Sequence, residues 1–116
     1  MEGYYIQDIA PEDPRFRNKS AVPNAVCYQN AMFTWHNQNP DVVYGVTKAI
    51  LENTDEFADS HPSAKYWSLS HRPISLAVPY HDGAVRYFQE KGLWTAKAQA
   101  YQDKLLKRQA ELLKNQ

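Results

Sequence analysis

The sequence predicts a mixed α/β chain, which would be an α+β module if it folds alone, with a few short strands followed by about four helices. Strand-type composition fills the first third, and helix-capping signals recur from Asn39 onward. The last part of the chain has the pattern of a long amphipathic helix. With 116 residues, of which 43% are apolar, we expect one ordered domain or a fragment of one. Its expected parts are a strand and loop (1–20), a core (21–94) and a terminal helix (95–116).

Two early stretches have strand character. Residues 4–9 alternate in part, and the prolines that follow at positions 11 and 14 predict an exposed loop up to residue 20. A second strand is expected from about Ala25, with Pro23 at its start or on an edge. Amides interrupt this stretch, so the strand either ends near Asn30 or resumes through Trp35. A turn is expected over 36–39.

Asn39 and Pro40 predict the start of a helix that runs to Asn53. Gly45 inside it indicates close packing, because glycine otherwise weakens a helix. Thr54 is expected to cap a short second helix over 55–60. The buried stripe of the first helix is predicted to consist of residues at three- and four-residue spacing, Val43, Val46, Ile50 and Asn53.

The second half contains two more helix signals. Residues 66–69 could be a helical turn or extended, and the alternation over 74–78 is too short to predict a strand. A helix should open at His81 or Asp82 and end at Gly92 in a left-handed cap. Thr95 should cap the terminal helix. The apolar faces are predicted to be Ala84, Val85, Tyr87 and Phe88 in the first of these helices and Ala98, Tyr101, Leu105, Gln109 and Leu112 in the second.

Charge and hydropathy exclude several classes of protein. The net charge is zero, but residues 1–62 carry four Lys or Arg against nine Asp or Glu, a net of −5, and residues 95–116 come to +3. The basic face of the terminal helix lacks interleaved aromatics, so we expect a solvated face and no nucleic-acid partner. No apolar run is long enough to span a membrane. Cys27 is the only cysteine and is expected to be buried and inert.

Catalytic and metal-binding motifs are not recognisable. The chain has no Gly-rich phosphate loop, no G-x-S-x-G and no H-E-x-x-H, and its four histidines are far apart. We therefore expect no metal, no cofactor and no enzymatic activity, with a small enzyme using His81 as the weakest alternative. The acids at 55, 56 and 59 suit a helix start. The three tryptophans are expected to pack in the core or under a lid, although they could stack a ligand.

Three side chains are the predicted ligand contacts, Asn24, Tyr28 and Asn30. Amides and a phenol beside an apolar strand can orient a small carboxylate or amide ligand through hydrogen bonds. The alternative is that these groups, with Gln29, satisfy strand edges and turns.

Four motifs occur in a characteristic order. They are Val22-Pro23, the segment Asp41–Asn53, His61-Pro62-Ser63 and the segment Pro79–Phe88. In this order the chain resembles the C-terminal part of the solute-binding proteins of tripartite ATP-independent periplasmic (TRAP) transporters, in the TAXI subfamily. The resemblance covers roughly residues 20–110.

The resemblance implies part of a periplasmic-binding-protein-like lobe from a longer, two-lobed protein. Such a protein would capture a small organic anion or amino acid in the periplasm and deliver it to TRAP membrane subunits. The first residues lack a signal-peptide pattern. The alternative is therefore a stand-alone cytoplasmic sensor or accessory module that self-associates, as a homodimer for example, and binds a small ligand or protein partner.

Overall fold

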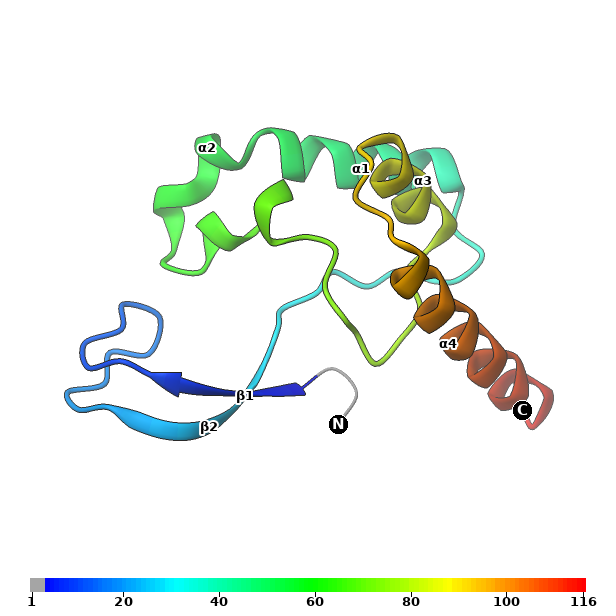
Figure 1. Ribbon diagram of the computed structural model, residues 1–116. Coiled ribbons are helices and arrows are strands. Elements are labelled where there is room, and N and C mark those ends of the chain that lie inside the picture. The colour runs from blue at the N-terminus through cyan, green and yellow to red at the C-terminus, as the bar shows by residue number, and fades with distance from the viewer. Residues whose placement is uncertain (1–3) are drawn as a thin grey trace.

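The structure, a computed structural model, describes residues 4–116 (Figure 1). The first three residues, which the prediction about a signal peptide partly uses, lie outside the described part. The predicted mixed α/β class is confirmed, as a small partial domain with a two-stranded sheet and four helices among the described residues. The elements are β1 (Tyr4–Ile9), β2 (Val22–Tyr28), α1 (Pro40–Glu52), α2 (Thr54–Phe57), α3 (Asp82–Glu90) and α4 (Ala96–Lys114), with short 3₁₀ turns at Ala58–Ser60, Ala64–Tyr66 and Leu69–His71.

Strands β1 and β2 form an antiparallel hairpin, in which Tyr4 pairs with Tyr28 and Ile9 with Val22. Between these pairs the register shifts, because β2 carries one residue more than β1. Asn24 lies at this bulge with a φ of 53°, a left-handed conformation that asparagine tolerates better than most residues. Its backbone N–H donates a hydrogen bond to Asp8 Oδ1 at 2.8 Å.

Strand β2 ends at Tyr28, and the chain does not resume a strand through Trp35. No further strand is present in residues 4–116 for this segment to pair with. Residues 29–38, which we call the strap, instead lead irregularly from the hairpin to α1 (Figure 1). Trp35 on the strap is 80% exposed, so the prediction that every tryptophan packs in a core or lid is wrong there.

The predicted caps of the three longer helices are confirmed. Asn39 Oδ1 accepts from the N–H of the second residue of α1 at 2.8 Å, His81 Nδ1 accepts from Gly83 at 3.2 Å, and the Thr95 hydroxyl accepts from Ala98 at 3.1 Å. The prediction that Thr54 caps α2 is wrong. Thr54 is the first helical residue, and its hydroxyl donates to the carbonyl of Trp67 at 2.6 Å.

The core lies where α1 crosses α3, and an aromatic group fills it: Tyr87 and Phe88 are almost fully buried, and Trp94 stacks on Phe88 at 6.4 Å. Gly83 allows the close approach, because a Cβ there would lie 2.8 Å from Tyr44 N. The prediction of close packing at Gly45 is wrong, since nothing lies near the Cβ position of that residue.

The predicted buried stripe of α1 is only partly correct. Leu51 is buried, and Val43 and Ile50 are half-buried, but Val46 is 42% exposed and Asn53 is exposed. The helix therefore turns only part of its apolar side toward α3. The remainder faces open space on the strap side.

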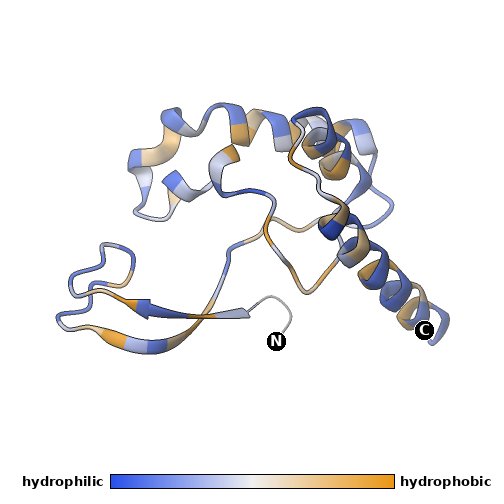
Figure 2. Ribbon diagram, in the orientation of Figure 1, coloured by the Kyte–Doolittle hydropathy of each residue, from blue (hydrophilic) through white to orange (hydrophobic). Residues whose placement is uncertain are grey.

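Helix α4 packs on the body through its first half only. Gln102 and Leu105 are buried, whereas Leu112 is 58% and Leu113 45% exposed. Figure 2 shows that apolar residues nevertheless continue toward the C-terminal end of α4. The radius of gyration is 16.1 Å. A compact chain of this length would have about 13 Å, so the described chain is open in shape.

Candidate ligand-binding site

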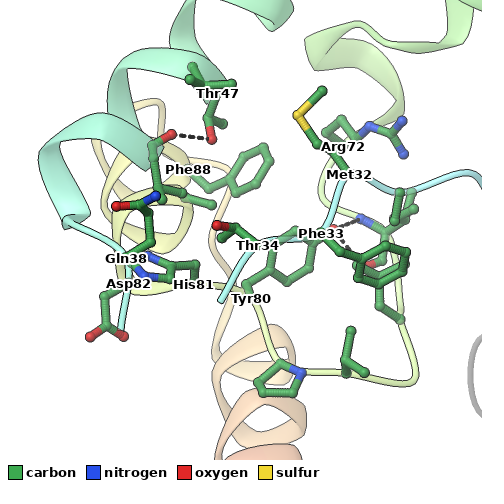
Figure 3. Close-up of a pocket in the computed structure, with 18 of the residues that line it drawn as sticks. Met32, Phe33, Thr34, Gln38, Thr47, Arg72, Tyr80, His81, Asp82 and Phe88 are labelled. Carbon is green, nitrogen blue, oxygen red and sulfur yellow. Dashed lines mark hydrogen bonds between the residues drawn. The ribbon is translucent and has the colours of Figure 1, made fainter. Parts of the chain in front are cut away.

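A cavity of about 630 Å³ lies between α1, the strap, the segment that precedes α3, and α4 (Figure 3). This volume falls within the range of small-molecule sites, roughly 300 to 1,000 Å³. The lining is mainly apolar. Its apolar side chains are Ala31, Met32, Phe33, Val42, Val43, Val46, Ile50, Leu51, Trp67, Ile74, Leu76, Val78, Pro79, Tyr80, Ala84, Phe88 and Leu106, and its polar ones are Asn30, Thr34, His36, Gln38, Thr47, Arg72, His81, Asp82 and Gln109.

The cavity explains the exposed valines of α1. Val42 and Val46, which are 52% and 42% exposed, line it from the helix side. Met32 and Phe33 line it from the strap and are 64% and 71% exposed. The apolar stripe of the first helix therefore serves two surfaces, one packed on α3 and one facing the cavity.

Several polar groups of the lining already have partners. The Thr47 hydroxyl donates to the carbonyl of Val43 at 2.8 Å. The Tyr80 hydroxyl accepts from the N–H of Ile74 and donates to its carbonyl, both at 2.9 Å, and burial raises the pKa of this phenol. These two hydroxyl groups therefore stabilise the wall of the cavity. Polar contacts with a ligand would come from other residues of the lining.

His81 combines a structural role with an unpartnered atom. Its Nδ1 accepts the capping bond from Gly83, so in the neutral ring Nε2 carries the proton. Nε2 is buried and has no hydrogen-bond partner. The sequence predicted the cap but not the unpartnered donor beside a cavity.

Arg72 is the cation of the lining. Its guanidinium carbon lies 4.7 Å from the centre of the Trp67 ring, and its Nη1 donates to Gln29 Oε1 at 3.4 Å. Within residues 4–116 no carboxylate forms an ion pair with it, and burial lowers its pKa. Arg15 and Arg86, by contrast, pair with Asp13 and Asp41. Sequence reasoning missed Arg72, because nothing in the pattern His71-Arg72-Pro73 shows that its partner is missing.

The structure does not bring the three predicted contacts together. Asn30 lines the cavity, whereas Asn24 forms the bulge of the hairpin. Tyr28 is 69% exposed and lies edge-on to Tyr4, with ring centres 6.4 Å apart. Gln29, weighed beside them, accepts the long bond from Arg72.

The other chemical groups are dispersed. No cluster of three or more His, Cys, Asp or Glu side chains with metal-site geometry occurs between residues 4 and 116. Of the acids at 55, 56 and 59, the first two lie in the first turn of α2 and all are exposed. Cys27 is buried, as predicted. In the described part of the chain, no helix combines the length and apolarity needed to cross a bilayer.

A family model described as the NMT1-like family matches residues 2–92. The match includes the hairpin, the strap, α1, α2 and α3, and it ends before α4. No curated protein and no solved structure matches the chain. The matched region covers well over half of the sequence and holds both helices of the core and most of the cavity lining. The chain therefore belongs to the NMT1-like family, a periplasmic binding protein-like family.

Proposed function

We propose that the chain is a non-enzymatic binding protein, or part of one, that holds a small organic anion or amino acid in the cavity beside α1. The observation that carries the proposal is an apolar cavity of about 630 Å³ in a chain of a solute-binding-type family. Concave, mainly apolar sites with a few polar groups are typical of small-molecule binding. Ligand binding would shift the chain toward the form in which strap and helices close on the ligand.

The proposal extends to a TRAP transport system of the TAXI type. Two observations support it. The motifs occur in the order typical of TAXI proteins, and two of them, Asp41–Asn53 and Pro79–Phe88, supply α1 and α3, which form one wall of the cavity. The parent system would then work in the periplasm and deliver its ligand to TRAP membrane subunits. In this proposal both motifs build and cap the wall of the site, and the strap supplies the ligand contact Asn30.

Asn30 is the ligand contact that we propose with most support, because it lines the cavity from the strap. Asn24 and Tyr28 lie on the hairpin, and their contact with a ligand stays a prediction that would require the hairpin to move toward the cavity. Substituting Asn30 by Ala should weaken ligand binding without unfolding the chain. Asn37→Ala, a change at another exposed amide of the strap that does not line the cavity, is the matched control.

Native mass spectrometry of the purified chain, before and after mild denaturation, tests the proposal. A non-covalent small molecule that is released on denaturation supports it, and the released mass limits its identity. For a chain purified without a ligand, titration calorimetry against a panel of organic acids and amino acids takes its place. If none binds in the millimolar range or tighter, the binding function is wrong.

A second candidate is a self-associating sensor or accessory module, with a second copy of the chain as its partner. The exposed Leu106, Leu112 and Leu113 on α4 favour it, as does the +3 charge of residues 95–116 against −5 for residues 1–62. Opposite charges on the two parts of the chain suit a two-fold contact, in which the basic terminal helix of each copy meets the acidic part of the other. Analytical ultracentrifugation should show a dimer that Leu112→Glu together with Leu113→Glu dissociates. A monomer at every concentration would contradict self-association.

A further inference from the structure

We propose that the cavity selects a monocarboxylate with an apolar body, that Arg72 binds its carboxylate, and that α-amino acids are disfavoured. This inference rests on the proposed binding function and narrows its ligand class. It goes beyond that function because it assigns the anchoring residue and the charge that a ligand must lack.

The first step is the environment of Arg72. The side chain is half-buried, so it has lost part of its hydration, and burial lowers its pKa. A partly desolvated cation is unfavourable unless an anion or good hydrogen-bond acceptors compensate. Within residues 4–116 no carboxylate pairs with it, and the contact to Gln29 Oε1 is long at 3.4 Å. A bound anion would provide the missing compensation.

The second step is the orientation of the guanidinium. Its carbon lies 4.7 Å from the centre of the Trp67 ring, within the range of cation–π contact, and Trp67 itself lines the cavity. A guanidinium has five N–H donors in a plane, and one of them makes the bond to Gln29. The remaining donors suit a two-point contact with a carboxylate, which is the geometry that arginine forms best.

The third step is the apolar body. The apolar walls of the same cavity include Met32 and Phe33 on the strap, Ile50 on α1 and Ile74 on the segment before α3. Met32 and Phe33 are more than 60% exposed. An alkyl or aromatic ligand would cover these side chains, and each square ångström of apolar surface removed from water contributes about 25 cal/mol.

The fourth step is the position of the opposite charge. Asp82 is the one carboxylate among the described residues of the lining. Figure 3 shows Asp82 and Arg72 on opposite sides of the cavity. An α-amino acid bears its ammonium one carbon from the carboxylate, so a carboxylate on Arg72 would place that ammonium beside the cation and far from Asp82. Like charges at short range are unfavourable, so the ammonium would reduce affinity.

Four probes with one carbon skeleton test the inference: 4-phenylbutanoate, 4-phenylbutan-1-ol, 4-phenylbutylamine and 2-amino-4-phenylbutanoate. Calorimetry on the unaltered chain should show the acid binding about tenfold tighter than the alcohol, as expected for a charged hydrogen-bonded pair. The amine and the amino acid should both bind more weakly than the acid. Equal binding of acid and alcohol would overturn the role of Arg72 and leave the binding function intact, whereas no binding by any probe would count against the binding function itself.

Two arginines allow a matched comparison. Arg72→Met should remove the preference for the acid over the alcohol while leaving alcohol binding nearly unchanged. Arg86→Met is the control, because Arg86 also lies over an aromatic ring, Tyr44 at 4.4 Å, but pairs with Asp41 at 2.9 Å and does not line the cavity. The control variant should keep the preference. Loss of the preference in both variants, or in neither, would contradict the assignment.

A second measurement needs no variant, in case Arg72→Met does not fold. Phenylglyoxal modifies accessible guanidinium groups, and peptide mass spectrometry locates the modified residues. The acid should protect Arg72 from modification, the alcohol should not, and Arg86 should react equally in both cases. Modification of Arg72 at the same rate with saturating acid as without it would refute a direct contact.

Discussion

Gln102 of α4 and Tyr80 ahead of α3 are joined by two reciprocal hydrogen bonds. The Tyr80 backbone N–H donates to Gln102 Oε1 at 2.9 Å, and Gln102 Nε2 donates to the Tyr80 carbonyl at 2.7 Å. Gln102 is only 3% exposed, and it is the buried polar side chain of the described residues. The side-chain amide of Gln102 thus pairs with the backbone of Tyr80 as a neighbouring strand would. It holds α4 against the segment that lines the cavity.

Gln102→Met should therefore destabilise the fold although its size is nearly unchanged. It leaves two backbone groups of Tyr80 without partners, and each such buried group costs about 1 to 3 kcal/mol. We expect a loss of about 2 to 6 kcal/mol in urea-induced unfolding followed by circular dichroism. Gln89→Met, at an exposed position of α3, is the control and should change stability little. Similar losses in both variants would show that the paired bonds contribute nothing specific.

The two helical glycines should respond in opposite directions to alanine. At Gly83 a Cβ would meet the Pro40 carbonyl and lie 2.9 Å from Val43 Cβ, so α1 and α3 would have to separate. Gly83→Ala should cost about 1 to 3 kcal/mol, as overpacking usually does. Gly45 has open space around it, so Gly45→Ala should gain up to about 1 kcal/mol from helix propensity. Thermal unfolding of both variants checks this, and a gain at Gly83 would contradict the close approach.

Tyr87 should make the fold sensitive to alkaline pH. Burial, and then its hydrogen bond to Glu52 Oε1 at 3.1 Å, raise the pKa of Tyr87 from 10.0 to about 12. The stability that comes from this raised pKa is complete below about pH 10 and is lost as the pH rises through about 12.

Tyr87→Phe lacks the ionising group and should lose less stability than the unaltered chain across that interval, as measured by urea midpoints at several pH values. Some pH dependence should remain, because Tyr44 and Tyr80 also have raised pKa values. Tyr28→Phe, at an exposed position, is the control and should lose stability as the unaltered chain does. Identical alkaline profiles for Tyr87→Phe and the unaltered chain would remove Tyr87 from this account.

Val46→Trp should fill the cavity. Val46 lines it from α1 and is 42% exposed, so an indole has room without displacing the core. We expect ligand binding to be lost or reduced at least tenfold while stability changes by less than about 1 kcal/mol. Lys48→Trp on the same helix, which does not line the cavity, should bind as the unaltered chain does. Undiminished binding by Val46→Trp would place the ligand elsewhere.

What the sequence predicted correctly is local. Asn39, His81 and Thr95 each cap a helix through a contact within three residues of the chain, and such contacts depend on little beyond their neighbours. The left-handed conformation of Gly92 just after α3, with a φ of 68°, is of the same kind. These signals were enough for the helices and for the mixed α/β class.

What it could not predict is the meeting of distant segments. Gly45 and Gly83 look alike in sequence, and only the crossing of α1 over α3 decides which of them is crowded. Val46 continues a helical stripe, but whether that stripe meets protein or a cavity depends on the path of the strap. Arg72 is informative because no carboxylate within residues 4–116 pairs with it, and the sequence does not show which residues lie near it in space.

The strap has two structural roles. It lines the cavity with Asn30, Met32 and Phe33, and it is the covalent link between the hairpin and the helices. Arg15, in the loop of the hairpin, also contacts the helical body, because its guanidinium carbon lies 5.2 Å from the centre of the Tyr66 ring. A ligand that displaces the strap must therefore move the hairpin as well. The position of the hairpin would then depend on whether the cavity holds a ligand.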